Sequence, residues 1–81
     1  MNLRVIFGYE LKKFIKLKIP IAKIGSEAFS FYWENIENIE EDFEDLLLTL
    51  NKMELGKEFE YSYGELNEIA ESLIRGEKLN L

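Results

Sequence analysis

The chain has 81 residues, carries a net charge of −6, and is 47% apolar and 14% aromatic. This length predicts a single small domain over residues 1–81, and the apolar content argues against intrinsic disorder. The chain contains no cysteine and no histidine, which excludes disulfides, thiolate metal sites and the commonest general base.

Charge is divided unevenly along the chain. Residues 1–25 hold six bases and one acid, whereas residues 26–81 hold four bases and fifteen acids, which gives +5 and −11. An acidic body favours a basic partner and disfavours direct binding of nucleic acid. No stretch approaches the roughly 18 apolar residues of a membrane span, and the N-terminal stretch lacks the apolar h-region of a signal peptide. We therefore expect a cytoplasmic protein that does not bind a membrane.

The first predicted helix covers residues 3–17. Lys12, Lys13 and Lys16 fall in its last turns, where cations interact favourably with the helix dipole, and Pro20 prevents its continuation. We interpret these lysines as intramolecular partners of the acidic body, with contacts to phosphate or a membrane surface as the alternative. The apolar residues recur at helical spacing, and they are Leu3, Ile6, Phe7, Leu11, Phe14 and Ile15.

The second helix, residues 20–36, has two possible starts. In the first, which we prefer, Pro20 occupies the first helical position. That start turns one stripe inward, which consists of Ile21, Ile24, Ala28 and Phe31. In the second, Gly25 lies in a turn and Ser26 is the cap. That start turns a different stripe inward, which consists of Phe29, Tyr32, Trp33 and Ile36.

The third helix, residues 39–55, carries a heptad-like seam of Ile36, Ile39, Phe43, Leu46, Leu50 and Met53. Asn38 and Glu41 have the spacing of a capping box, and Gly56 suits the C′ position after the helix. We prefer a break between the second and third helices near residues 35–38. One continuous helix through both segments is the alternative.

The fourth helix, residues 63–75, has the clearest start signal. Ser62 and Glu65 form the S-x-x-E pattern of a capping box, and Gly76 is placed to end the helix. Four amphipathic helices with short connections predict an all-α fold, specifically a small antiparallel four-helix bundle.

An acidic run, ENIENIEEDFED, spans residues 34–45 and contains seven acids and no base. If the run is helical, Glu37 and Glu41 form a like-charge i, i+4 pair, as do Glu40 with Glu44 and Glu41 with Asp45. A solvated helix face usually carries compensating lysines, so their absence points to a basic partner. The predicted partner-binding acids are Glu34, Glu37, Glu40, Glu41, Asp42, Glu44 and Asp45.

The aromatic block at residues 29–33 surrounds its helix on every side. We assign Phe29 and Phe31 to the core, and Tyr32 and Trp33 to the partner-binding surface as aromatic anchors. No metal or cofactor site is predicted, since the carboxylates lack histidine partners and no calcium-loop pattern occurs. Without a base to activate its serines, the chain is not expected to be an enzyme.

These features resemble the colicin D-type immunity proteins. The resemblance rests on Leu11-Lys12-Lys13-Phe14 followed by Lys18-Ile19, then Phe29 and Tyr32-Trp33-Glu34, with the acidic middle and an amphipathic last helix. Pro20 and Gly25 depart from the family pattern. The resemblance implies a helical bundle whose acidic surface covers the basic active site of a tRNA-cleaving toxin.

We therefore expect a protein inhibitor, an immunity protein or antitoxin, that masks the basic surface of a toxin or nuclease domain. One alternative is a phage-encoded inhibitor that mimics nucleic acid against a host defence nuclease. Another is a structural module in which the seam at residues 36–53 pairs with a second copy, so a homo-oligomer stays open.

Overall fold

The computed structural model describes residues 2–77, which form four α-helices and three short 3-10 helices and contain no strand. The predicted all-α class is confirmed. The α-helices are α1 (Leu3–Lys16), α2 (Ile21–Glu34), α3 (Glu41–Asn51) and α4 (Tyr63–Arg75). The 3-10 helices are η1 (Ile36–Asn38), η2 (Lys52–Glu54) and η3 (Lys57–Phe59). Among these described residues, no helix combines the length and the apolar character that a membrane span requires.

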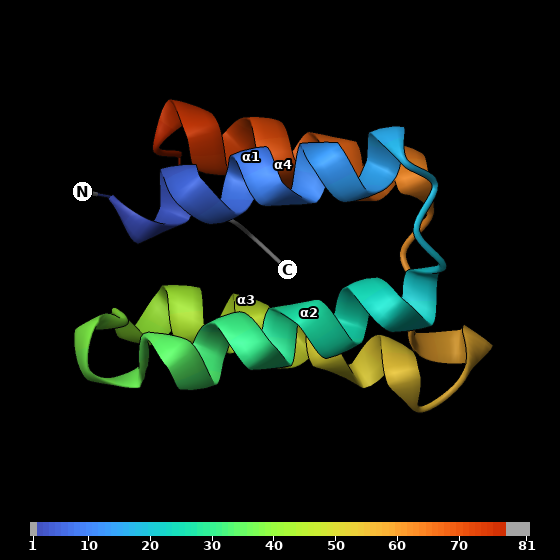
Figure 1. The fold of residues 1–81 in the computed structure, drawn as a ribbon, viewed down its shortest axis with the longest axis horizontal. Helices are drawn as coiled ribbons and strands as arrows, with labels where there is room; N and C mark the ends of the chain where they lie inside the picture. The colour runs from blue at the N-terminus through green and yellow to red at the C-terminus, as the bar shows by residue number, and fades with distance from the viewer. Residues whose placement is uncertain (1, 78–81) are drawn as a thin grey trace. The chain divides into compact units, whose positions relative to one another are not determined.

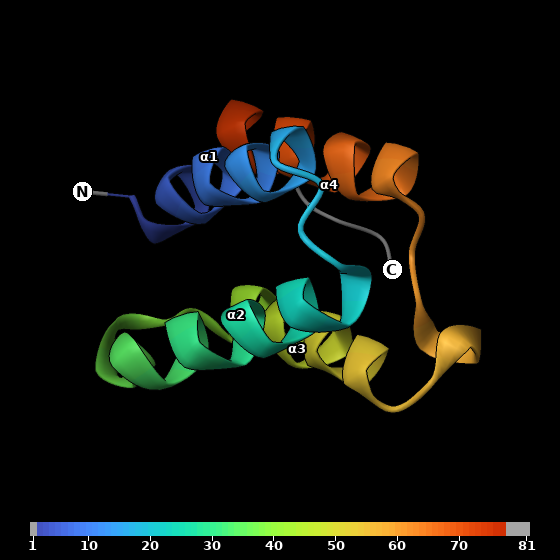
Figure 2. The same ribbon diagram turned by 45° about the vertical axis from the view of Figure 1, so that its right-hand side comes forward.

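Contacts divide the chain into two units, each built on a pair of helices. Among the described residues, one unit contains residues 2–19 and 61–77, and the other contains residues 20–60. In Figure 1 and Figure 2 the blue α1 lies beside the orange-to-red α4, and α2 lies beside α3. The partners in each pair run antiparallel. The single domain expected from the length stays a prediction.

The α1–α4 unit is held by a close backbone approach at one end and a hydrogen bond at the other. A Cβ added to Gly8 would lie 2.8 Å from Ile74 Cγ1 and 3.0 Å from the Ala70 carbonyl oxygen. Near the other end, the Tyr63 hydroxyl donates to the Ile19 carbonyl oxygen at 2.7 Å. The fully buried apolar side chains of this unit are Phe7, Leu11, Leu66, Ala70 and Leu73.

Helix α1 ends in a Schellman motif, which explains why the chain leaves the helix before Pro20. The Ile19 N–H donates to the Phe14 carbonyl oxygen, and the Lys18 N–H donates to the Ile15 carbonyl oxygen, both at 3.0 Å. Lys18 adopts a left-handed φ of +54°, the conformation that this motif requires at C′. Gly76 plays the same part after α4 with a φ of +74°, as its sequence position predicts.

The α2–α3 unit also depends on one glycine. A Cβ added to Gly25 would lie 2.8 Å from the Leu50 carbonyl oxygen and 3.4 Å from Met53 Cβ. Ile24 and Ala28, on the same side of α2 as Gly25, are fully buried. The preferred inward stripe of α2 is therefore correct at its centre, although Pro20 serves as the N-cap and the helix begins at Ile21.

The predicted seam of α3 is buried only in its second part. Phe43, Leu46, Leu50 and Met53 are all at most 2% exposed, whereas Ile36 is 41% exposed. The prediction was wrong for Ile36 because the helix does not extend back to it. The helical conformation is interrupted between Glu34 and Glu41, close to the predicted position. Ile36 therefore belongs to η1 and is not part of the α3 stripe.

Both ends of α3 differ from the prediction. The N-cap is Glu40, which makes no side-chain capping hydrogen bond, so Asn38 and Glu41 do not form the predicted box. At the other end the chain tightens into η2, and Gly56 lies two residues beyond it, at the start of η3. The capping box at Ser62 and Glu65 is confirmed, with both reciprocal hydrogen bonds present at 3.1 and 2.9 Å.

The close approach at Gly25 predicts a large effect of a single methyl group. Gly25→Ala should lower the free energy of unfolding by about 1–3 kcal/mol, since the new Cβ meets a backbone carbonyl that cannot rotate away. Gly64→Ala is the matched control, because its Cβ would have no neighbour closer than 3.8 Å. There the better helix propensity of alanine should stabilise by up to about 1 kcal/mol. Urea unfolding followed by circular dichroism measures both, and equal stability of the two variants would contradict the prediction.

Candidate protein-interaction surface

The candidate surface begins where α2 ends. The Asn35 side-chain amide donates to the Phe31 carbonyl oxygen at 2.9 Å, and the Asn35 N–H donates to the Tyr32 carbonyl oxygen at 3.3 Å. These bonds satisfy two carbonyls that the last turn would otherwise leave without a partner. The chain then turns through η1 and extended residues before α3 begins.

Three aromatic side chains on the last turns of α2 form what we call the ring cluster: Phe29, Tyr32 and Trp33. The Trp33 ring packs edge-to-face against both others, with centroids 6.0 Å from Phe29 and 5.6 Å from Tyr32. Phe29 and Tyr32 stack at 6.3 Å. Trp33 is 57% exposed and Phe29 is 37% exposed. The rings therefore support one another while a large part of their apolar surface faces solvent.

The opposite side of α2 connects to α3 through another aromatic pair. The Phe31 and Phe43 rings meet edge-to-face with centroids 6.1 Å apart, and Phe43 is 2% exposed. This contact ties the end of α2 to the first turn of α3. It thereby positions the ring cluster and the connection that carries the acidic run.

The acidic run follows this connection. Six of its seven acids are exposed, and Glu44 is half-buried. Glu34 ends α2, Glu37 lies in η1 and Glu40 occupies the N-cap position of α3. The other four lie within α3 and are Glu41, Asp42, Glu44 and Asp45. The seven predicted acids, together with Tyr32 and Trp33, thus all lie within residues 32–45 of the α2–α3 unit, divided among the end of α2, η1 and the start of α3.

The interruption of the helix between Glu34 and Glu41 changes the electrostatics of the acidic run. Glu37 and Glu41 are not on one helix, so the like-charge pair predicted between them is absent. Glu41, Asp42 and Glu44 occupy the first turn of α3, where the helix dipole stabilises negative charge. The side-chain oxygen of Asp42 also accepts a hydrogen bond from the Phe43 N–H at 3.0 Å. Within α3, like-charge repulsion at i, i+4 spacing therefore remains mainly between Glu41 and Asp45.

The acids are distributed along the surface. Within residues 2–77, no group of three or more carboxylates is arranged to hold a metal ion. Spread-out acids act on a partner through their summed field, which attracts a basic surface from a distance. This arrangement suits a protein-binding surface better than a site for one ion.

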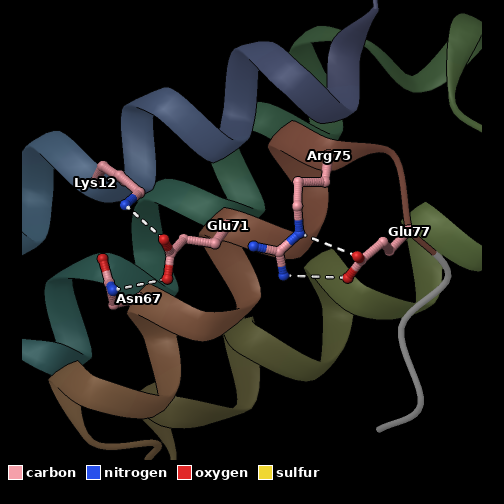
Figure 3. Close-up of polar contacts among 5 residues, drawn as sticks. All are labelled: Lys12, Asn67, Glu71, Arg75 and Glu77. Atoms are coloured by element: carbon pink, nitrogen blue, oxygen red, sulfur yellow. Dashed lines mark hydrogen bonds and ion pairs between the residues drawn. The ribbon is translucent and has the colours of Figure 1, made fainter.

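The α1–α4 unit contains a shallow groove with a volume of about 280 Å³. It is lined by Tyr9, Lys12, Glu71, Ile74 and Arg75. Figure 3 shows that Lys12 contacts Glu71 within the groove and that Arg75 contacts Glu77, which follows α4. Lys12 lies 3.6 Å from a Glu71 carboxylate oxygen, in line with the intramolecular role expected for the N-terminal lysines.

Arg75 in this groove is held by Glu77. The guanidinium donates two hydrogen bonds to the carboxylate, at 3.0 and 3.2 Å. These bonds, and then the attraction between the charges, lower the pKa of Glu77 and raise the pKa of Arg75. Because both cations of the groove already have anionic partners, it offers less to a ligand than the ring cluster does.

Comparisons with known proteins place the chain in no family: it matches no family model, no curated protein and no solved structure. The resemblance to colicin D-type immunity proteins therefore stays a prediction, and the function has to be argued from the surface itself.

Sequence reasoning missed one member of the surface. Phe29 was expected in the core but is partly exposed within the ring cluster. The signal was present in the sequence, because Phe29 and Trp33 are four residues apart and share a face of α2. That face is not the face of Ile24 and Ala28, which pack inward.

A surface role for Trp33 predicts that folding does not depend on it. Trp33→Ala should change the free energy of unfolding by no more than about 1 kcal/mol, since the side chain loses only partial burial and two ring contacts. Phe43→Ala removes a buried ring from the same unit and should cost about 3–5 kcal/mol. Thermal and urea unfolding compare the two variants. A similar loss for both would assign Trp33 to the core and remove it from the candidate surface.

Proposed function

We propose that this protein is a stoichiometric protein inhibitor, an immunity protein or antitoxin, that masks the basic surface of a nuclease-type toxin. The observation that carries the proposal is a set of mutually packed, partly exposed rings followed directly along the chain by a run of seven acids, six of them exposed. Both features lie in residues 29–45, within one unit of the chain.

The two features supply different parts of binding. Exposed aromatic area contributes affinity when a partner covers it, and tryptophan and tyrosine are the residues most enriched at binding hot spots. Acidic charge raises the rate at which a basic partner associates and makes that rate sensitive to salt. A surface with both properties suits an inhibitor that must capture a basic protein quickly and hold it.

The resemblance to colicin D-type immunity proteins supports the same class of partner, a tRNA-cleaving domain with a basic active site. The proposal includes two further expectations from the sequence, namely an antiparallel four-helix bundle and a cytoplasmic location. It includes no catalytic activity, because the sequence contains no cysteine nucleophile and no histidine that could activate a serine.

Self-association through the α3 seam is a weaker candidate. Phe43, Leu46, Leu50 and Met53 are buried within this chain and are not available to a second copy. A phage-encoded mimic of nucleic acid would use the same acids against a different nuclease. The two inhibitor hypotheses differ in the partner, so nuclease assays against both kinds of enzyme separate them.

The proposal is tested with the purified tRNA-cleaving domain of a colicin D-type toxin. An equimolar amount of this protein should abolish tRNA cleavage. The association rate, measured by stopped flow, should fall at least about tenfold between 50 and 500 mM salt, because screening weakens attraction between exposed charges. Sedimentation should give a one-to-one complex.

Charge reversal identifies the surface. Replacing Glu37, Glu41 and Asp45 by lysine should slow association by roughly a further tenfold. The control replaces Glu58, Glu60 and Glu68, which are also exposed, so the change in net charge is the same. If both triple variants slow association equally, net charge and not this surface is responsible. If the chain neither binds nor inhibits such a domain, the proposed partner class is wrong.

A further inference from the structure

The ring cluster has the composition of a site for a positively charged side chain. Its three rings touch one another with centroids 5.6 to 6.3 Å apart, and Trp33 is the most exposed of them. The face of an aromatic ring carries partial negative charge and attracts a cation within about 6 Å of its centre. Several rings held together offer such a cation more than one contact.

The surroundings of the cluster have the same sign. The rings lie on the last two turns of α2, and the negative end of the helix dipole is at Glu34. The last turn of α2 contains no basic residue, and Glu37 follows in η1. Ring faces, helix end and carboxylates all favour a positive group and disfavour an anion. A purely apolar occupant would leave this charge uncompensated.

We propose that the ring cluster receives an arginine side chain of the basic partner, with its guanidinium stacked on Trp33 and its N–H groups directed to Glu34 or Glu37. This inference rests on the proposed function, because it assumes that the partner is a basic protein. It adds the residue type that the surface selects and the place where that residue binds.

Arginine fits this site better than lysine for three physical reasons. The guanidinium is planar and stacks on an aromatic face, whereas the lysine ammonium is a compact point charge. It is more weakly hydrated, so burial against rings costs less. Its N–H groups lie in the plane and can donate two bonds to a carboxylate while the face contacts the ring.

Trp33 is the only tryptophan in the chain, so its fluorescence reports on the proposed site alone. The probes are capped hexa-arginine and hexa-lysine peptides, which carry equal charge, titrated into the full chain at about 50 mM salt. Both should bind through the acids, but hexa-arginine should bind at least about threefold more tightly. It should also shift the Trp33 emission more strongly at saturation.

Variants connect this preference to the rings. Calorimetry with Trp33→Ala and Phe29→Ala should show hexa-arginine binding no more tightly than hexa-lysine, whereas Trp33→Phe should keep part of the difference. Phe59→Ala is the matched control, because Phe59 is a partly exposed ring in the same unit outside the cluster. It should leave the preference unchanged.

The outcomes separate this inference from the proposed function. Equal affinity for the two peptides in the native chain, or a preference that survives Trp33→Ala, overturns the arginine site. The proposed function is judged separately, by inhibition of the toxin domain and the effect of charge reversal at Glu37, Glu41 and Asp45. A chain that inhibits the toxin but does not distinguish the peptides would keep the function and lose the site.

Discussion

The distance between helix backbones at Gly25 determines which residues of α2 reach the surface. A Cβ at this position would lie 2.8 Å from the Leu50 carbonyl oxygen, which is closer than two non-bonded atoms tolerate. Because the residue is glycine, α2 can lie directly against α3, and Ile24 and Ala28 then enter the core. The same rotation of the helix turns Phe29 and Trp33 outward. Exposure of the ring cluster is thus a consequence of one packing contact.

The α1–α4 pair is built on a similar constraint, since Gly8 lies against the Ala70 carbonyl oxygen and the Ile74 side chain. Glycine within a helix costs about 1 kcal/mol relative to alanine, and close packing of the partner helix offsets this loss. Each unit therefore has one helix position where helix propensity favours alanine but close packing of the partner helix requires glycine. Glycine occupies both positions.

The break between α2 and α3 alters the meaning of the acidic run. On a continuous helix its carboxylates would repel one another over three turns. In the structure several of them occupy the first turn of α3, where the dipole stabilises them, and Glu37 belongs to a separate turn. Repulsion among the acids is therefore weaker than a continuous helix would give. A basic partner is favoured more by the partly exposed rings that precede this run of seven acids along the chain.

Affinity and association rate are expected to have separate origins on this surface. The acids are exposed and spread along the connection, so they act over several ångströms and lose strength in salt. The rings act only in contact, and their contribution changes little with salt because it comes from buried area and stacking. Such a division gives fast capture together with slow dissociation.

Local interactions made much of the fold predictable from the sequence. The capping box at Ser62 and Glu65, the helix stop before Pro20 and the end of α4 at Gly76 each depend on residues within one turn. The break near Asn35 was also predicted, although the N-cap of α3 and the role of Gly56 were not. The seven acids and Trp33 could be named as candidate partner-binding residues, because charge and residue type are properties of the sequence.

The inward face of α2 was predicted correctly at its centre, but only through the preference for Pro20 as the helix start, because no local interaction fixes the face. One stripe contains Ile24 and Ala28, and the other contains Phe29 and Trp33, so both are apolar at helical spacing. Hydrophobicity alone favours the larger aromatic stripe for the core. Only the fit of Gly25 against the Leu50 carbonyl, a contact between residues 25 positions apart, selects the smaller stripe. The sequence by itself therefore determined the number of helices, their approximate positions and the distribution of charge along the chain, and tertiary packing decided which rings stay exposed.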